Sequence, residues 1–114
     1  MNADEYQKLA SRTLNEKPVT VPTDAEIMLV WCSVGVAGEA GEVNEWVKKV
    51  VFHRHPADLG KLQKEIGDVL WYLSGICTIM GFSMGEVMEM NIEKLRERYL
   101  ASFTVEESFH DKDS

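Results

Sequence analysis

The chain has 114 residues, a length that suits one domain with a small core, and 45% of them are hydrophobic, which is normal for a folded globular protein. The formal net charge of −7 repels nucleic-acid backbones, so nucleic-acid binding is not expected. An acidic protein that handles phosphates needs divalent cations between the like charges, which directs attention to clustered carboxylates.

No membrane or export segment is expected. The first 13 residues are polar and lack the apolar stretch of a secretory signal. The longest strongly apolar run, about 69–80, is shorter than the roughly 20 residues that a spanning helix needs. Cys32 and Cys77 lie in apolar stretches without a CxxC pair, so reduced core cysteines are expected. These features predict a cytoplasmic protein with no membrane partner.

The chain predicts four helices and no strands, starting with a short helix over residues 3–15. A capping-box pattern, Thr23-Asp24-Ala25-Glu26, opens a second helix that runs to about Val51. Pro56 separates it from a third helix over about 58–80, which Gly81 ends. Ser83-Met84-Gly85-Glu86 is a second capping box, and it opens a fourth helix to about Tyr99. The acidic tail, 101–114, is predicted to be loosely ordered.

These elements predict a single all-α domain over residues 1–114, with its core at about 24–99. Short connections favour an antiparallel, four-helix bundle-like protomer. The third helix is apolar nearly all round from Val69 to Met80, and Trp71 falls opposite its core stripe. Since a small chain cannot cover every side of such a helix, we expect oligomerisation to complete the fold, as a homodimer or homotetramer. Coverage by the first helix and the tail is the alternative.

Two pairs of carboxylates break the helical pattern. Glu39 lies in the middle of an apolar stripe on the second helix, and Glu42 is one turn further on. Glu65 and Asp68 have the same spacing on the third helix, beside its apolar centre. An antiparallel pair would bring all four together. Ion pairing of surface carboxylates with Lys48, Lys49, Lys61 or Lys64 is the alternative.

Oxygen ligands without histidine or cysteine favour Mg²⁺, or Mn²⁺, over softer metals. Di-iron bundles usually place a histidine three residues after a glutamate. In this chain the residues three positions after Glu39, Glu42 and Glu65 are Glu42, Glu45 and Asp68. Mg²⁺ is often completed by substrate phosphates. Gly35, Gly38 and Gly41 weaken the second helix, so a partner helix or a ligand should approach its backbone closely.

The apolar stripe of the fourth helix is also interrupted, here by an amide with basic residues close by. Asn91 lies in its apolar stripe, with Arg98 close by and Lys94 at the edge. A cationic strip facing a metal–carboxylate cluster suits a polyphosphate. His53 and His55, between the second and third helices, are expected to be solvated.

Taken together, the segments GEAGEV, KK, FHRHP, KEIGDVLWYL and NIEKLRERY resemble the MazG-like nucleotide pyrophosphohydrolases, from about Val30 to Tyr99. The family pattern is ExxE followed by ExxD, and here 22 residues separate Glu42 from Glu65. The resemblance implies an all-α, Mg²⁺-dependent enzyme that hydrolyses a nucleoside triphosphate to the monophosphate and pyrophosphate. Many members carry a further glutamate where this chain has Gly38. Glu45 is the candidate to replace it, although its side chain points roughly 120° away from Glu39 around the helix.

The resemblance assigns roles to eight side chains. The metal ligands and catalytic residues would be Glu39, Glu42, Glu65 and Asp68, and the phosphate contacts would be Lys49, Asn91, Lys94 and Arg98. Glu39 is the preferred general base, because apolar surroundings raise the proton affinity of a carboxylate. Three alternatives stay open: a related hydrolase for dUTP or phosphoribosyl-ATP, a non-catalytic helical interaction or regulatory module, and a metal-storage bundle.

Overall fold

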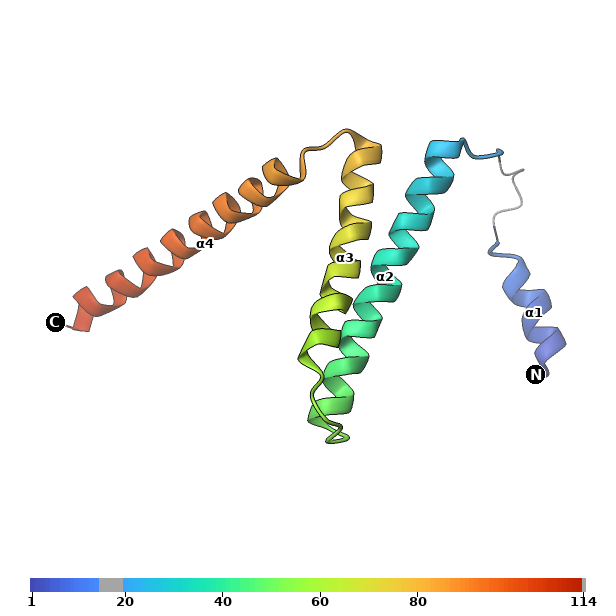
Figure 1. Ribbon diagram of the computed structural model, residues 1–114, viewed down its shortest axis with the longest axis horizontal. Coiled ribbons are helices and arrows are strands. Elements are labelled where there is room, and N and C mark those ends of the chain that lie inside the picture. The colour runs from blue at the N-terminus through green and yellow to red at the C-terminus, as the bar shows by residue number, and fades with distance from the viewer. Residues whose placement is uncertain (15–19, 114) are drawn as a thin grey trace.

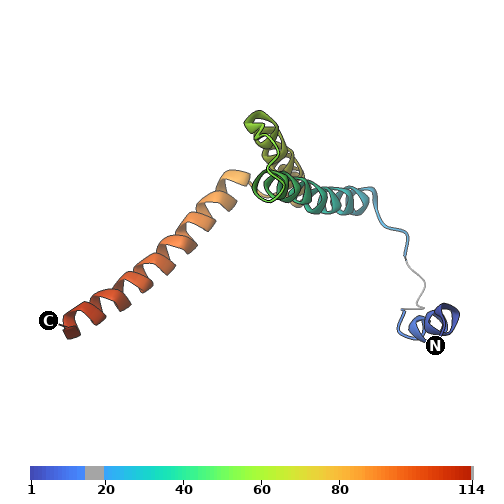
Figure 2. The same ribbon diagram turned by 90° about the horizontal axis from the view of Figure 1, so that it is seen from below.

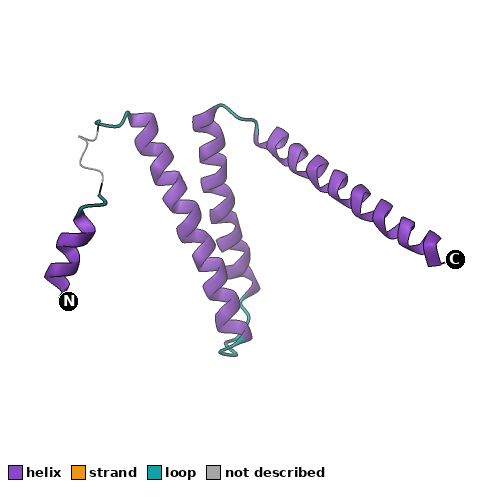
Figure 3. Ribbon diagram, turned by 180° about the vertical axis from the view of Figure 1, so that it is seen from behind, coloured by secondary structure: helices purple, strands orange, loops and turns teal. Residues whose placement is uncertain are grey.

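The computed structural model describes residues 1–14 and 20–113, and side chains as far as Ala101. Its four helices are α1 (Ala3–Ser11), α2 (Asp24–Val51), α3 (Leu59–Met80) and α4 (Met84–Asp113). Figure 3 shows helices joined by loops and turns, with no strand among the described residues. The all-α prediction is confirmed. The predicted end of the first helix, residue 15, lies outside the described residues.

Local signals in the sequence set most of the helix ends. The Thr23 hydroxyl accepts from the Glu26 N–H at 3.2 Å, and the Glu26 carboxylate accepts from the Thr23 N–H at 2.9 Å, so the first predicted capping box is complete. Asp58 caps α3 by accepting from the Lys61 N–H. Gly81 ends α3 with a left-handed φ of 72°, which glycine adopts without steric cost.

The end of α4 differs from the prediction. The helix runs to Asp113, whereas the sequence predicts an end near Tyr99. No proline or glycine follows Gly85, so the chain offers no residue that stops a helix. The change to polar composition after Tyr99 therefore does not mark the end of this helix, and the loose order of the tail over 101–114 stays a prediction.

The antiparallel pair of α2 and α3 is the packed part of the fold. These two helices run side by side along most of their length, while α1 and α4 point away from them on opposite sides (Figures 1 and 2). Cys32 is the one described residue that is fully buried, and its thiol, like that of Cys77, is free. The small core therefore lies between α2 and α3.

The predicted four-helix bundle does not form within one chain. The direction of the chain turns by 107° between α3 and the Met84–Ala101 part of α4, whereas an antiparallel neighbour requires a turn near 180°. The radius of gyration is 22.5 Å, compared with about 13 Å for a compact chain of similar length. The prediction that α4 packs antiparallel to α3 within one chain was therefore wrong. The short connection between the two helices limits where α4 begins but does not fix its direction.

No single described helix combines the length and apolar character needed to cross a membrane. A bent combination of α3 with Met84–Ala101 meets these requirements by length and composition only.

Two glycines allow α2 and α3 to approach closely. A Cβ atom at Gly35 of α2 would overlap the ring of Tyr72 on α3. A Cβ atom at Gly75 of α3 would lie 2.9 Å from the sulfur of Cys32 on α2. The expectation that a partner helix approaches the backbone is therefore met at Gly35. Apart from the neighbouring residues and backbone of α2 itself, no described atom comes within 4 Å of a Cβ built at Gly38 or Gly41.

We predict opposite effects for the same substitution at two glycines of α2. Gly35→Ala should lower the free energy of unfolding by about 1–3 kcal/mol, because the new methyl group displaces the Tyr72 ring. Gly38→Ala should raise it by up to about 1 kcal/mol, because alanine favours the helix and finds open space there. Urea unfolding of both variants measures these changes, and equal effects of the two substitutions would contradict the close-approach model.

Candidate functional site

Three carboxylates meet where the middle of α2 faces α3. One oxygen from each of Glu39, Glu65 and Asp68 lies within 4.8 Å of the other two. Glu39 and Glu65 are half-buried, while Asp68 is exposed at the edge of the helix pair. The antiparallel packing of the two helices brings these residues together, although 25 positions separate Glu39 from the next member of the cluster.

Glu42 lies beside this cluster. It is exposed, one helical turn closer to the loop that joins α2 to α3, and it lines a pocket together with Glu65. Its charge still acts on Glu39, as described below. The structure therefore brings three of the four predicted carboxylates close enough together to share one metal ion, and it places the fourth, Glu42, at the edge of this cluster.

Glu39 carries the electrostatic signature of the cluster. Removal of water from around its side chain raises its pKa above the ordinary 4.5, and the nearby charges of Asp68, Glu65 and Glu42 raise it further. A side-chain hydrogen bond with Glu65 acts in the same direction. Like charges are thus held close together, and a cation bound among them would relieve their repulsion.

The donor set fits a hard divalent cation. All three clustered ligands are carboxylate oxygens, which Mg²⁺ and Mn²⁺ prefer. Two oxygens bound to one Mg²⁺ at about 2.1 Å lie at most about 4.2 Å apart, which is close to the limit of 4.8 Å within which the three oxygens lie. No described histidine or cysteine belongs to the cluster, whereas di-iron bundles usually include histidine ligands.

A pocket of about 290 Å³ opens from the carboxylates toward the loop end of the helix pair. It is lined by residues of α2, the loop and α3: Glu42, Glu45, Trp46, Lys49, Val50, His55, Pro56, Asp58, Lys61 and Glu65. The Trp46 indole N–H donates to the Asp58 carbonyl at 3.0 Å, which ties α2 to the start of α3. Trp46 is thus a packing residue that also forms part of the pocket wall.

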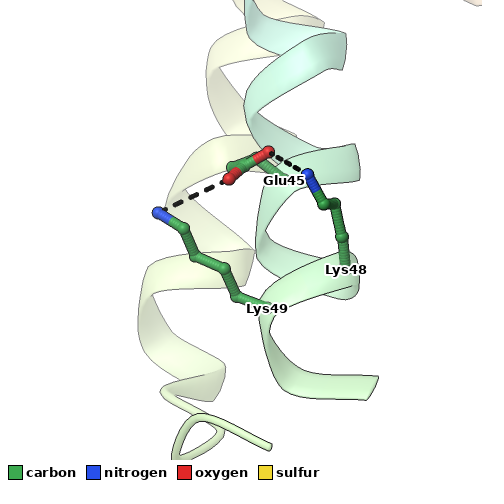
Figure 4. A network of polar contacts seen from close by, with 3 residues as sticks. All are labelled: Glu45, Lys48 and Lys49. Atoms are coloured by element: carbon green, nitrogen blue, oxygen red, sulfur yellow. Dashed lines mark ion pairs between the residues drawn. The ribbon is translucent and has the colours of Figure 1, made fainter. Parts of the chain in front are cut away.

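Glu45 forms ion pairs with two lysines of its own helix. Its carboxylate lies 3.9 Å from the Lys48 ammonium and 3.7 Å from that of Lys49 (Figure 4). Glu45 does not belong to the 4.8 Å cluster. These contacts argue against Glu45 as a replacement for the family glutamate that is missing at Gly38. Of its two partners, only Lys49 lines the pocket.

The three predicted phosphate contacts on α4 are not near the carboxylates of the same chain. Asn91, Lys94 and Arg98 lie on the part of α4 that points away from the helix pair (Figure 1). Lys94 there lines a shallow hollow formed by α4 alone. One chain therefore brings Lys49 close to the carboxylate site and leaves the other three predicted contacts apart from it.

An aromatic cluster adjoins the site on the side opposite the pocket. Trp31 makes edge-on contacts with Trp71 and Tyr72, at ring-centroid distances of 5.8 and 5.5 Å. Tyr72 was not among the predicted site residues, and it follows Asp68 by one helical turn. The spacing of Tyr72 from Asp68 was the available signal, because residues four apart share a helix face.

We predict that Glu39→Gln stabilises the metal-free protein at neutral pH. Because the folded-state pKa of Glu39 is raised, the unfolded chain ionises first, and stability is lost as the pH rises from 4.5 through the raised value. The neutral amide removes that loss. In chelator at pH 7, the melting temperature of Glu39→Gln should exceed that of the wild type, and the difference should shrink below pH 4.5. A lower melting temperature for the variant at pH 7 would contradict the repulsive cluster.

Comparison with known proteins identifies the fold family. The family model described as the MazG nucleotide pyrophosphohydrolase domain matches residues 33–103, a range that contains all four predicted carboxylates. The chain is also 31% identical over 102 residues to Gene 37 protein of Mycobacterium phage L5, covering 86% of this chain and 89% of that protein. No solved structure matches the chain. The protein therefore belongs to the MazG nucleotide pyrophosphohydrolase domain family.

Proposed function

We propose that this protein is a Mg²⁺-dependent nucleoside triphosphate pyrophosphohydrolase, which converts an NTP or dNTP to the monophosphate and pyrophosphate. The convergence of Glu39, Glu65 and Asp68 from two helices is the observation that carries the proposal. Membership of the family supports a nucleotide as the substrate. Mutual repulsion of these carboxylates disfavours their close approach, so a purely structural role does not explain why they lie together.

Glu39, Glu65 and Asp68, with Glu42 at the rim, are the proposed ligands of Mg²⁺. Bound Mg²⁺ would neutralise triphosphate charge and lower the pKa of coordinated water. Mn²⁺ offers the same oxygen preference. The open space beside Gly38 and Gly41 leaves room for a ligand along this face of α2.

The proposed reaction breaks the P–O bond between the α- and β-phosphates. A water oxygen bonds to the α-phosphorus, and the water proton passes to a carboxylate. The bond from that phosphorus to the bridging oxygen breaks, and pyrophosphate leaves with the bond electrons. Glu39 is the proposed proton acceptor, because water exclusion and neighbouring charges raise its proton affinity. Lys49 is proposed to contact the phosphates from the pocket.

The proposed enzyme works as a homo-oligomer, a homodimer or homotetramer. The accessible surface of one chain is 10095 Å², whereas a compact protein of 12.9 kDa exposes roughly 6,300 Å². The excess is of the size that obligate interfaces bury. Large apolar side chains lie exposed on both packed and unpacked helices: Val34, Ile66, Leu70, Trp71, Met88, Met90, Ile92 and Leu95. A second copy would cover them.

Such an assembly would also complete the site. Among the residues of one chain that the structure describes, α4 makes no extensive contact with α2 or α3. When α4 of one copy lies across the helix pair of another, Asn91, Lys94 and Arg98 can face the partner's carboxylates. The positive charges of Lys94 and Arg98 complement that acidic cluster. We propose that these three residues contact phosphates in this arrangement.

The first test is pyrophosphate release from a panel of ordinary and modified nucleoside triphosphates. The wild type should release pyrophosphate with Mg²⁺ and not with chelator, and Glu42→Gln should lower kcat/KM by at least about 100-fold. The control is Asp24→Asn, which makes the same charge change on α2 about 22 Å along the helix from Glu39. No release from any nucleotide by folded wild type would favour the non-catalytic interaction module.

The second test asks which chain supplies the α4 contacts. One chain carries Glu42→Gln and the other carries Lys94→Gln with Arg98→Gln. If α4 acts on the partner's site, a mixed dimer contains one site with both defects and one intact site. Mixing the two inactive proteins should then restore activity at one of the two sites in each mixed dimer. Continued inactivity of a verified mixed dimer would contradict action between chains.

A further inference from the structure

We infer that the pocket at the loop end of α2 and α3 binds the leaving pyrophosphate, with Lys49 and Lys61 as its cationic contacts. The inference rests on the proposed hydrolase function and adds a place for one of its two products. It also gives roles to Lys61 and the loop, which the carboxylate site does not use. The pocket has a volume of about 290 Å³ and shares Glu42 and Glu65 with that site.

The position of the pocket sets the direction in which a substrate would lie. The carboxylate cluster occupies the middle of the helix pair, and the pocket extends from Glu42 and Glu65 toward the loop. A triphosphate whose α–β bond lies at the cluster would direct its β- and γ-phosphates into this pocket. A second pocket between α2 and α3 is lined by apolar residues and offers no cationic contact for phosphates.

The charges in the pocket suit a polyanion bound together with cations. Four acidic residues and two lysines line it, so a polyanion would need Mg²⁺ beside it to offset the excess of acidic charge. Glu45 pairs with Lys49, whereas the Asp58 carboxylate accepts from the backbone N–H of Lys61 at 3.0 Å and does not engage the Lys61 ammonium. Glu42 and Glu65 form the side that faces the proposed metal. Pyrophosphate can bridge that side to the lysines, because it carries anionic oxygens at both ends.

The loop is built in a way that holds the pocket wall in place. The His55 N–H donates to the Lys49 carbonyl at 3.0 Å, and Arg54 adopts the left-handed conformation, with φ of 55°, to make that turn. Trp46 fixes the start of α3 through Asp58. Lys49, His55 and Lys61 therefore surround one opening although they belong to three segments.

Two pairs of lysines provide matched tests of this site. Lys48 and Lys49 both pair with Glu45, but only Lys49 lines the pocket. Lys61 and Lys64 are both exposed on the first turns of α3, but only Lys61 lines the pocket. Replacing either member of a pair by glutamine changes the net charge equally, so a difference within a pair reports the position of the side chain.

The experiment is calorimetric titration of the full-length protein with inorganic pyrophosphate, in excess Mg²⁺. Lys49→Gln and Lys61→Gln should each weaken binding at least about tenfold, which corresponds to about 1.4 kcal/mol. Lys48→Gln and Lys64→Gln should bind within about twofold of the wild type. Nucleoside monophosphate, titrated in parallel, should bind all five proteins alike. Circular dichroism verifies that each variant is folded.

Three results would overturn the assignment: no pyrophosphate binding by the wild type, equal weakening within each lysine pair, or selective loss of monophosphate binding. The assays of triphosphate hydrolysis separate this proposal from the one on which it rests. A wild type that hydrolyses triphosphates while all four variants bind pyrophosphate equally would contradict the pocket alone. Lysine-dependent pyrophosphate binding without any hydrolysis would support the pocket and contradict the hydrolase.

Discussion

The close approach of α2 and α3 is the constraint on which the rest of the structure depends. Gly35 admits the ring of Tyr72, and Gly75 admits the thiol of Cys32, so the two backbones approach each other where a larger residue would separate them. The carboxylates meet one to two turns further along the same interface. Their repulsion opposes the packing that the glycines permit, and a hard cation is the simplest means of reconciling the two.

Much of this arrangement could be predicted from local signals in the sequence. The capping box at Thr23 and the end of α3 at Gly81 depend on neighbours within a turn or two, and they appear as expected. The direction of α4 could not be predicted, because it depends on which surface covers that helix. The role of Trp46 was also hidden, since its hydrogen bond reaches a carbonyl 12 residues away.

A single chain carries the acidic half of the proposed site and keeps most of the predicted cationic residues apart from it. Within the described residues, only the α2–α3 pair has a packed interface, and only Cys32 is fully buried. The exposed apolar residues of α4 follow a helical period and share that helix with Asn91, Lys94 and Arg98. Folding and completion of the site are therefore, in our proposal, two results of the same association.

The carboxylate cluster lies between two fixed points of the helix pair. On one side the Tyr72 ring is seated on Gly35, and on the other the Trp46 indole is bonded to the Asp58 carbonyl. A gap that is fixed at both ends resists widening. Ca²⁺ needs oxygens at 2.3–2.6 Å and more of them, whereas Mg²⁺ accepts fewer protein ligands at about 2.1 Å. In our proposal, the stiffness of the scaffold itself, rather than the chemistry of its carboxylates, would discriminate between ions by radius.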